Sequence, residues 1–137
     1  SPHTTRAELQ RAVFEGLAFA IVDALQGYPQ GGELYLTGGG AASATWLQII
    51  ADCTGRTVVS SAFNELSARG AAILAARSVA ALAETPPLAQ TRYQPRPQAH
   101  ARYAALYPVY RLLREQMLPV WQARQAALQP LSQDLQP

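Results

Sequence analysis

The chain has 137 residues, a hydrophobic fraction of 49% and a formal net charge of +2, which is typical of one water-soluble globular domain with a modest core. Its eleven basic residues are all arginine and are scattered along the sequence, so nucleic acid is not an expected partner. No stretch reaches the ~18 apolar residues of a membrane span, so no membrane is expected either. The single cysteine, Cys53, suits a reducing compartment and favours the cytoplasm.

A first helix is expected over residues 5–26. Thr5 and Glu8 have the spacing of a capping box. The apolar residues that follow at helical spacing are Leu9, Val13, Leu17, Ala20, Ile21, Ala24 and Leu25. Gly27 is placed to end this helix in a left-handed conformation, with Pro29 just beyond it.

A strand, a glycine turn and a helix are expected next. The strand covers residues 33–37, three glycines follow at 38–40, and an amphipathic helix covers residues 43–54 before Gly55 ends it. This layout allows backbone N–H groups and a helix N-terminus to meet a phosphate. A triple glycine alone is equally compatible with a tight structural turn, so the rest of the chain must decide between the two interpretations.

The second half of the chain is predicted to be mostly helical. A second strand is expected over residues 56–60, and a third helix over residues 65–82 carries a face of small side chains that permits close packing on a sheet or a ligand wall. Residues 84–97 contain four prolines and are predicted to form a crossing loop. A last helical region, residues 98–128, precedes a tail expected to fray.

The last helical region carries an apolar stripe, and Pro108 and Pro119 are expected to kink or divide it. The stripe consists of Tyr103, Leu106, Tyr110, Leu113, Met117 and Trp121. Such a stripe is predicted to be a packing seam against another domain.

Alternating helices and strands predict an α/β layer with parallel strands. Two visible strands would leave two open sheet edges and little core. The sequence therefore predicts that further strands come from a segment N-terminal to Ser1.

Several motifs, taken in order, resemble one family. Residues 38–48 read Gly-Gly-Gly-Ala-Ala-Ser-Ala-Thr-Trp-Leu-Gln, Glu15-Gly16 lies in the first helix, and Arg69-Gly70-Ala71-Ala72 follows Glu65. Tyrosines recur in the last part, at 93, 103 and 110. Together these residues resemble the C-terminal part of the FGGY carbohydrate kinases, and xylulokinase-like members above all, over residues 4–125.

The resemblance implies a fold and a division of the chain. The fold would be an incomplete actin-like (ribonuclease H-like) ATPase domain, with helices around a short parallel sheet and a C-terminal helical segment. Residues 1–83 would belong to the second, nucleotide-binding domain, and 84–97 would be the crossing loop. Residues 98–128 would pack towards a missing first domain, and 129–137 would be the tail.

The resemblance also implies a nucleotide site in the glycine turn. Gly39 and Gly40, flanked by Gly38 and Ala41, would face the phosphates of ATP through their N–H groups, and Ser43 would lie beside the adenine or ribose. Mg²⁺ ligands are not visible, since His3 and His100 are isolated and no paired ligand spacing occurs. No catalytic or metal-binding residue is therefore assigned.

The function implied by the resemblance is that of the C-terminal portion of an ATP-dependent carbohydrate kinase. ATP, with Mg²⁺, would donate its γ-phosphoryl group to a sugar or polyol held mainly by the first domain, which would also supply the catalytic aspartate. A homodimer is compatible with this. The alternative is a non-catalytic nucleotide-sensing or interaction module of the same fold. Glu15, Asp23 and Asp52 are interpreted as structural or solvated carboxylates, and Cys53 as a packing residue.

Overall fold

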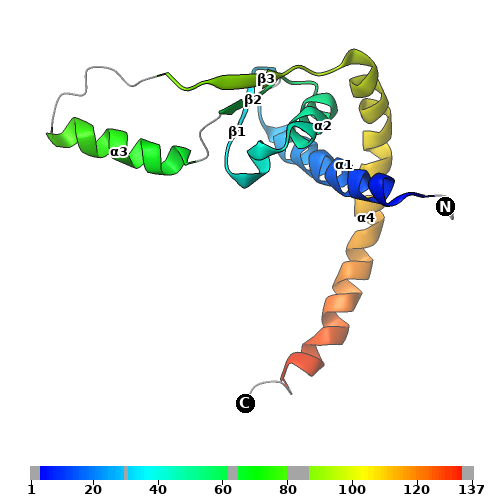
Figure 1. The fold of residues 1–137 in the computed structure, drawn as a ribbon. Helices are drawn as coiled ribbons and strands as arrows, with labels where there is room; N and C mark the ends of the chain where they lie inside the picture. Colours follow the sequence, from blue (N-terminus) through cyan, green and yellow to red (C-terminus); the bar gives the residue numbers. More distant parts are fainter. Residues whose placement is uncertain (1–3, 30, 62–64, 80–86, 134–137) are drawn as a thin grey trace.

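The computed structural model describes residues 4–29, 31–61, 65–79 and 87–133, with side chains described as far as residue 128 (Figure 1). In chain order the elements are α1 (Arg6–Ala24), the 3-10 turn η1 (Leu25–Gly27), β1 (Leu34–Leu36), the 3-10 turn η2 (Gly39–Ala42), α2 (Ala44–Thr54), β2 (Val58–Ser61), α3 (Leu66–Val79), β3 (Gln90–Tyr93) and α4 (Pro97–Gln133). The predicted helix and strand order is confirmed, with one strand added.

The start of α1 is as predicted and its end is not. The Thr5 hydroxyl accepts from the Glu8 N–H (3.3 Å), and the Glu8 carboxylate accepts from the Thr5 N–H (2.7 Å), which completes the capping box. The expected left-handed Gly27 is wrong, because the positive-φ glycines of the described residues lie elsewhere. The helix instead tightens into η1, where the Tyr28 N–H donates to the Leu25 carbonyl (3.0 Å).

The sheet has three described strands in the order β1-β2-β3. β1 and β2 are parallel, with Leu36 opposite Ser60, as the α/β pattern predicts. β3 is antiparallel to β2, so the prediction of a loop over residues 84–97 is wrong at Gln90–Tyr93; residues 84–86 lie outside the described residues. β3 was missed because its exposed, polar sequence has no strand periodicity, and only its pairing with β2 defines it.

The core is built around α2. This helix contacts α1, α4, β2 and β3, and it lies between the sheet and α1 (Figure 1). The buried residues of the core cluster are Ala18, Phe19, Leu47, Ile49, Ile50, Ala51, Cys53, Val58 and Tyr103. Since α2 supplies the majority of these side chains, its orientation determines where the turn at its N-terminus points.

α4 is one continuous helix of 37 residues. The two prolines do not divide it, and it extends past the expected start of the tail to Gln133. Its tyrosines surround Phe19 of α1, with ring centroids 6.0 Å away for Tyr103, 6.0 Å for Tyr107 and 5.3 Å for Tyr110. These contacts lie on both sides of Pro108 and hold this part of the helix against α1.

The predicted apolar stripe of α4 is therefore split between two environments. Its N-terminal part packs within this chain, since Tyr103 is buried and Tyr110 packs against the core. Leu106, Leu113 and Trp121 are more than half exposed. Beyond α1 the helix runs away from the rest of the chain (Figure 1).

α3 stands apart from the other elements (Figure 1). None of its described residues is buried. The face of small side chains predicted to pack on a sheet or ligand wall thus meets no such surface within the described part of this chain. The expected C-terminal end of this helix, residues 80–82, lies outside the described residues.

Gly55 offers a test of this packing. It adopts φ +67°, and a Cβ placed there would lie 2.6 Å from the Cε1 atom of His100. Gly55→Ala should therefore lower the free energy of unfolding by about 1–2 kcal/mol through the left-handed backbone, with a further loss from the collision. Urea denaturation of this variant, and of the same substitution in a His100→Ala background, measures the two parts. An equal cost in both backgrounds would contradict the contact between Gly55 and His100.

Candidate functional site

The glycine turn connects β1 to α2. Gly38 has φ +83° and ψ −171°, a conformation that L side chains rarely adopt. The Ala41 N–H donates to the Gly38 carbonyl (2.9 Å), and the Ser43 N–H donates to the Gly40 carbonyl (3.4 Å). Gly38 is therefore the position at which the turn itself requires glycine.

Gly39 and Gly40 have a different role, because their φ angles are ordinary. A Cβ at Gly39 would meet nothing within 4 Å, and one at Gly40 would touch only the Trp46 indole, 3.6 Å away. Both residues are exposed. Side chains at these positions are thus excluded neither by backbone strain nor by close packing, and the space above Gly39 is open to an approaching group.

Ser43 is the N-cap of α2. Its Oγ accepts from the Trp46 N–H (3.3 Å) and the residue is exposed. A hydroxyl that accepts one bond keeps its own proton free to donate. The five predicted nucleotide-binding residues therefore lie in one continuous turn, with Gly39, Gly40 and Ser43 accessible and Gly38 and Ala41 partly buried.

Two residues support the turn from the side of the sheet and of α1: Ser60, which the sequence analysis did not single out, and Trp46, which belongs to the motif of residues 38–48. Ser60 of β2, which is 6% exposed, donates its hydroxyl to the Ala41 carbonyl (3.3 Å). Trp46 packs on Phe14 of α1 with ring centroids 5.4 Å apart. The contact between Trp46 and Phe14 is consistent with the amphipathic patterns of α2 and α1. No local sequence pattern indicates that Ser60 bonds to the Ala41 carbonyl.

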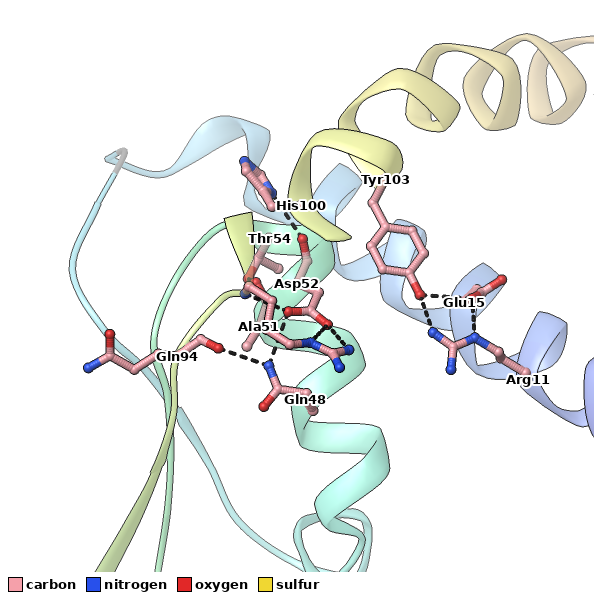
Figure 2. A network of polar contacts seen from close by, with 10 residues as sticks. Arg11, Glu15, Gln48, Ala51, Asp52, Thr54, Gln94, His100 and Tyr103 are labelled. Carbon is pink, nitrogen blue, oxygen red and sulfur yellow. Dashed lines mark hydrogen bonds and ion pairs between the residues drawn. The ribbon is translucent and has the colours of Figure 1, made fainter. Parts of the chain in front are cut away.

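A buried carboxylate lies in the C-terminal half of the same helix. Asp52 is fully buried and accepts from the Arg96 backbone N–H (2.8 Å) and from its guanidinium Nε (3.1 Å) and Nη2 (2.6 Å). The Gln48 amide bridges Asp52 (3.0 Å) and the Gln94 carbonyl (2.8 Å), as Figure 2 shows. Burial raises the pKa of Asp52, but the hydrogen bonds from Arg96 and Gln48 outweigh it and lower the pKa overall.

His100 secures the C-terminal end of α2. Its Nδ1 lies 2.9 Å from the Asp52 carbonyl oxygen (Figure 2). Because a carbonyl oxygen can only accept, Nδ1 carries the proton in this contact. Asp52 is thus held through both its side chain and its backbone by the segment that begins α4, which confirms a structural role for this residue.

The remaining polar contacts join α1 to α4. The Tyr103 hydroxyl donates to Glu15 (2.8 Å) and accepts from Arg11 (2.8 Å), while burial raises the pKa of Tyr103 to about 12. Asp23 accepts from Tyr107 and pairs with Arg114. Glu15 and Asp23 are therefore tie points between helices, in agreement with their structural interpretation.

Cys53 is buried in the core. Burial raises the pKa of the Cys53 thiol to about 12, so at neutral pH it is protonated and is not a nucleophile. A cavity of about 530 Å³ lies between α1 and α4 and is not lined by residues of the glycine turn. Among the described residues no group of three His, Cys, Asp or Glu could hold a metal ion, and none of the described helices is long and apolar enough to cross a membrane.

The comparison with known proteins identifies the family. The profile of the C-terminal domain of the FGGY family of carbohydrate kinases matches residues 1–79. The chain belongs to this family, and the predicted fold class, part of an actin-like ATPase domain, is confirmed. The antiparallel β3 is an addition to the expected parallel sheet.

Individual relatives agree with this assignment. A probable L-xylulose kinase of Pasteurella multocida is 33% identical over 116 residues, covering 81% of this chain and 24% of that protein. The xylulose kinase of Escherichia coli K12 is 33% identical over 124 residues, covering 82% and 25%. The crystal structure of xylulose kinase from Rhodospirillum rubrum aligns with a TM-score of 0.74 at 28% identity, covering 89% and 27%. The chain thus spans about a quarter of the length of the relatives it matches.

Asp52 generates a prediction on pH dependence. Against the effect of burial, hydrogen bonds from Arg96 and Gln48 lower the pKa of Asp52 in the folded protein. The ion pair therefore contributes fully above about pH 5, and the contribution is lost as the pH falls through the lowered pKa. Asp52→Asn should lower the free energy of unfolding at pH 7 by about 1–3 kcal/mol. Urea denaturation between pH 7 and pH 3 should show the difference from the parent protein shrinking as the pH falls.

Glu115→Gln is the matched control, since Glu115 is 56% exposed in its ion pair with Arg111. Its effect should stay below about 0.5 kcal/mol at pH 7. A loss for Asp52→Asn that stays constant down to pH 3 would contradict a lowered pKa.

Proposed function

We propose that this chain is the nucleotide-binding C-terminal part of an ATP-dependent carbohydrate kinase that phosphorylates a sugar or polyol hydroxyl. The observation that carries the proposal is the open glycine turn at residues 38–43, placed between β1 and the N-terminus of α2 in a chain of the FGGY family. Relatives named as xylulose and L-xylulose kinases favour a xylulose-like ketose as the acceptor.

The geometry supports phosphate binding at the turn. Phosphoryl transfer depends on positioning and on groups that stabilise negative charge on the phosphate oxygens. The exposed backbone at Gly39 and Gly40 can approach a phosphate closely, because a missing Cβ leaves that space free. The N-terminus of α2, an 11-residue helix, adds favourable dipole potential at the same place. The Ser43 hydroxyl remains available to the adenosine.

The remaining parts of the reaction would be supplied from outside this chain. The described carboxylates Glu15, Asp23 and Asp52 are engaged in contacts between elements, so the base that deprotonates the acceptor hydroxyl would come from a first domain. The described residues do not offer a set of ligands for Mg²⁺, and the ion would be held by the ATP phosphates or by residues of that other domain. The enzyme would act in the cytoplasm, and a homodimer is compatible with it.

The domain assignment extends this proposal. Residues 1–83, together with β3, would form part of the nucleotide domain, and residues 98–128 would be directed towards the first domain. Exposed Leu113, Val120 and Trp121 on distal α4 support a packing role there. Tyr103 and Tyr110 belong to the seam with α1 instead.

An assay of the full-length protein that contains this chain tests the function. Purified protein should release ADP from ATP in the presence of one member of a panel of xylulose, ribulose, gluconate, glycerol and erythritol. The 137-residue chain alone should phosphorylate none of them, because no residue in its described part is placed as a general base beside an acceptor hydroxyl. Nucleotide binding by the full-length protein without phosphorylation of any acceptor would favour the sensing module.

Gly39→Val tests the site. The two added methyl groups would occupy the open space above the turn, so the KM for ATP should rise about tenfold or more, equivalent to about 1.4 kcal/mol of lost binding. The thermal midpoint should change little, since a Cβ at Gly39 meets nothing within 4 Å.

Gly27→Val is the control for Gly39→Val. Gly27 also has an ordinary φ and open surroundings, but it lies in η1, which precedes β1, and not in the turn that follows β1. It should leave the KM for ATP unchanged. Unchanged ATP kinetics in Gly39→Val would instead identify the turn as purely structural.

A further inference from the structure

We infer that Ser60 is a positioning residue for the nucleotide turn, an inference that rests on the function proposed above. Ser60 does not reach the open side of the turn. It acts through Ala41, whose carbonyl oxygen accepts its hydroxyl proton at 3.3 Å. This contact joins the second strand of the sheet to the loop that follows the first.

The sheet register brings Ser60 to this place. β1 and β2 are parallel, and Ser60 lies opposite Leu36, the last residue of β1. The chain enters the glycine turn two residues after Leu36. Ser60 therefore lies near the carboxyl end of β2, next to the carboxyl end of β1 from which the turn begins. In parallel α/β sheets, ligands bind outside this end of the strands.

Ser60 is the buried polar residue of β2, directly after two buried valines and before the half-buried Ser61. Val58 and Val59 are 0% and 1% exposed, and Ser60 is 6% exposed. A buried hydroxyl requires a partner, and the partner here is a carbonyl of the turn, 19 residues earlier in the chain. The pairing therefore fixes the turn relative to β2 in addition to its covalent links to β1 and α2.

The hydrogen bonds of Ala41 explain why this contact would affect binding. The Ala41 N–H donates to the Gly38 carbonyl (2.9 Å), which closes the turn, and the Ala41 carbonyl is held by Ser60. Ala41 is thus fixed on both sides. Because Gly39 and Gly40 lie between Gly38 and Ala41, the directions of their N–H groups follow from these two contacts. Binding groups held in their productive directions before the ligand arrives bind it more tightly.

Ser60→Ala in the full-length protein tests the inference. The substitution removes only a hydroxyl oxygen, so the strand should fold, and the thermal midpoint checks that it does. The KM for ATP should rise about three- to tenfold, corresponding to about 0.7–1.4 kcal/mol. The KM for the sugar should stay within twofold. Amide hydrogen exchange over residues 39–43 should accelerate, because the turn loses its attachment to β2.

Thr54→Val is the matched control. The Thr54 hydroxyl also donates to a backbone carbonyl, that of Ile50 (2.7 Å), but at the opposite end of α2. This variant loses a comparable hydrogen bond and should leave the KM for ATP and the exchange of residues 39–43 unchanged. If both variants raise the KM for ATP equally, or if Ser60→Ala leaves it within twofold, Ser60 is not a positioning residue.

Calorimetric titration with ATP separates this inference from the proposed function. A full-length protein that binds ATP without phosphorylating any sugar would overturn the kinase proposal, while the ratio of the two ATP dissociation constants, Ser60→Ala to parent, would still decide the role of Ser60. A parent protein that does not bind ATP would overturn both.

Discussion

The buried carboxylate of Asp52 is the interaction on which the arrangement of this chain depends. Burying an ionised group costs free energy unless the group is fully paired. Asp52 is paired with the backbone N–H and the guanidinium of Arg96 and with the side-chain amide of Gln48. Arg96 directly precedes α4, so the pairing fixes where that helix begins. With the start of α4 anchored on α2 in this way, Tyr103 and Tyr110 of α4 contact Phe19 of α1.

Both ends of α2 are therefore held in place. Its N-terminus carries the glycine turn, with Ser43 as the cap, and its C-terminus is held by Asp52, His100 and the left-handed Gly55. Apolar contacts with α1 and β2 bury the middle of the helix, and polar contacts hold it at both ends. A helix constrained in this manner is a rigid base for a turn that would have to meet phosphate oxygens within a few tenths of an ångström.

Features that depend on neighbours in the sequence were predicted well. The capping box of Thr5 and Glu8, the end of α2 at Gly55, and the strand–turn–helix unit each depend on residues only a few positions apart. Among the features that depend on distant partners, the parallel pairing of β1 with β2 was predicted, and the following two were not. β3 exists through its pairing with β2, and Asp52 meets Arg96 across 44 positions. The order and spacing of the site residues pointed to the family, but the support that Ser60 gives to the turn lay outside any local pattern.

The length of α4 has a mechanical consequence. The ion pair between Arg114 and Asp23 joins α4 to the C-terminal part of α1, and the helix continues from there to Gln133. At 1.5 Å per residue this continuation is about 28 Å long. Over that length, a tilt of about 10° at the Asp23 contact would displace the end of α4 by about 5 Å.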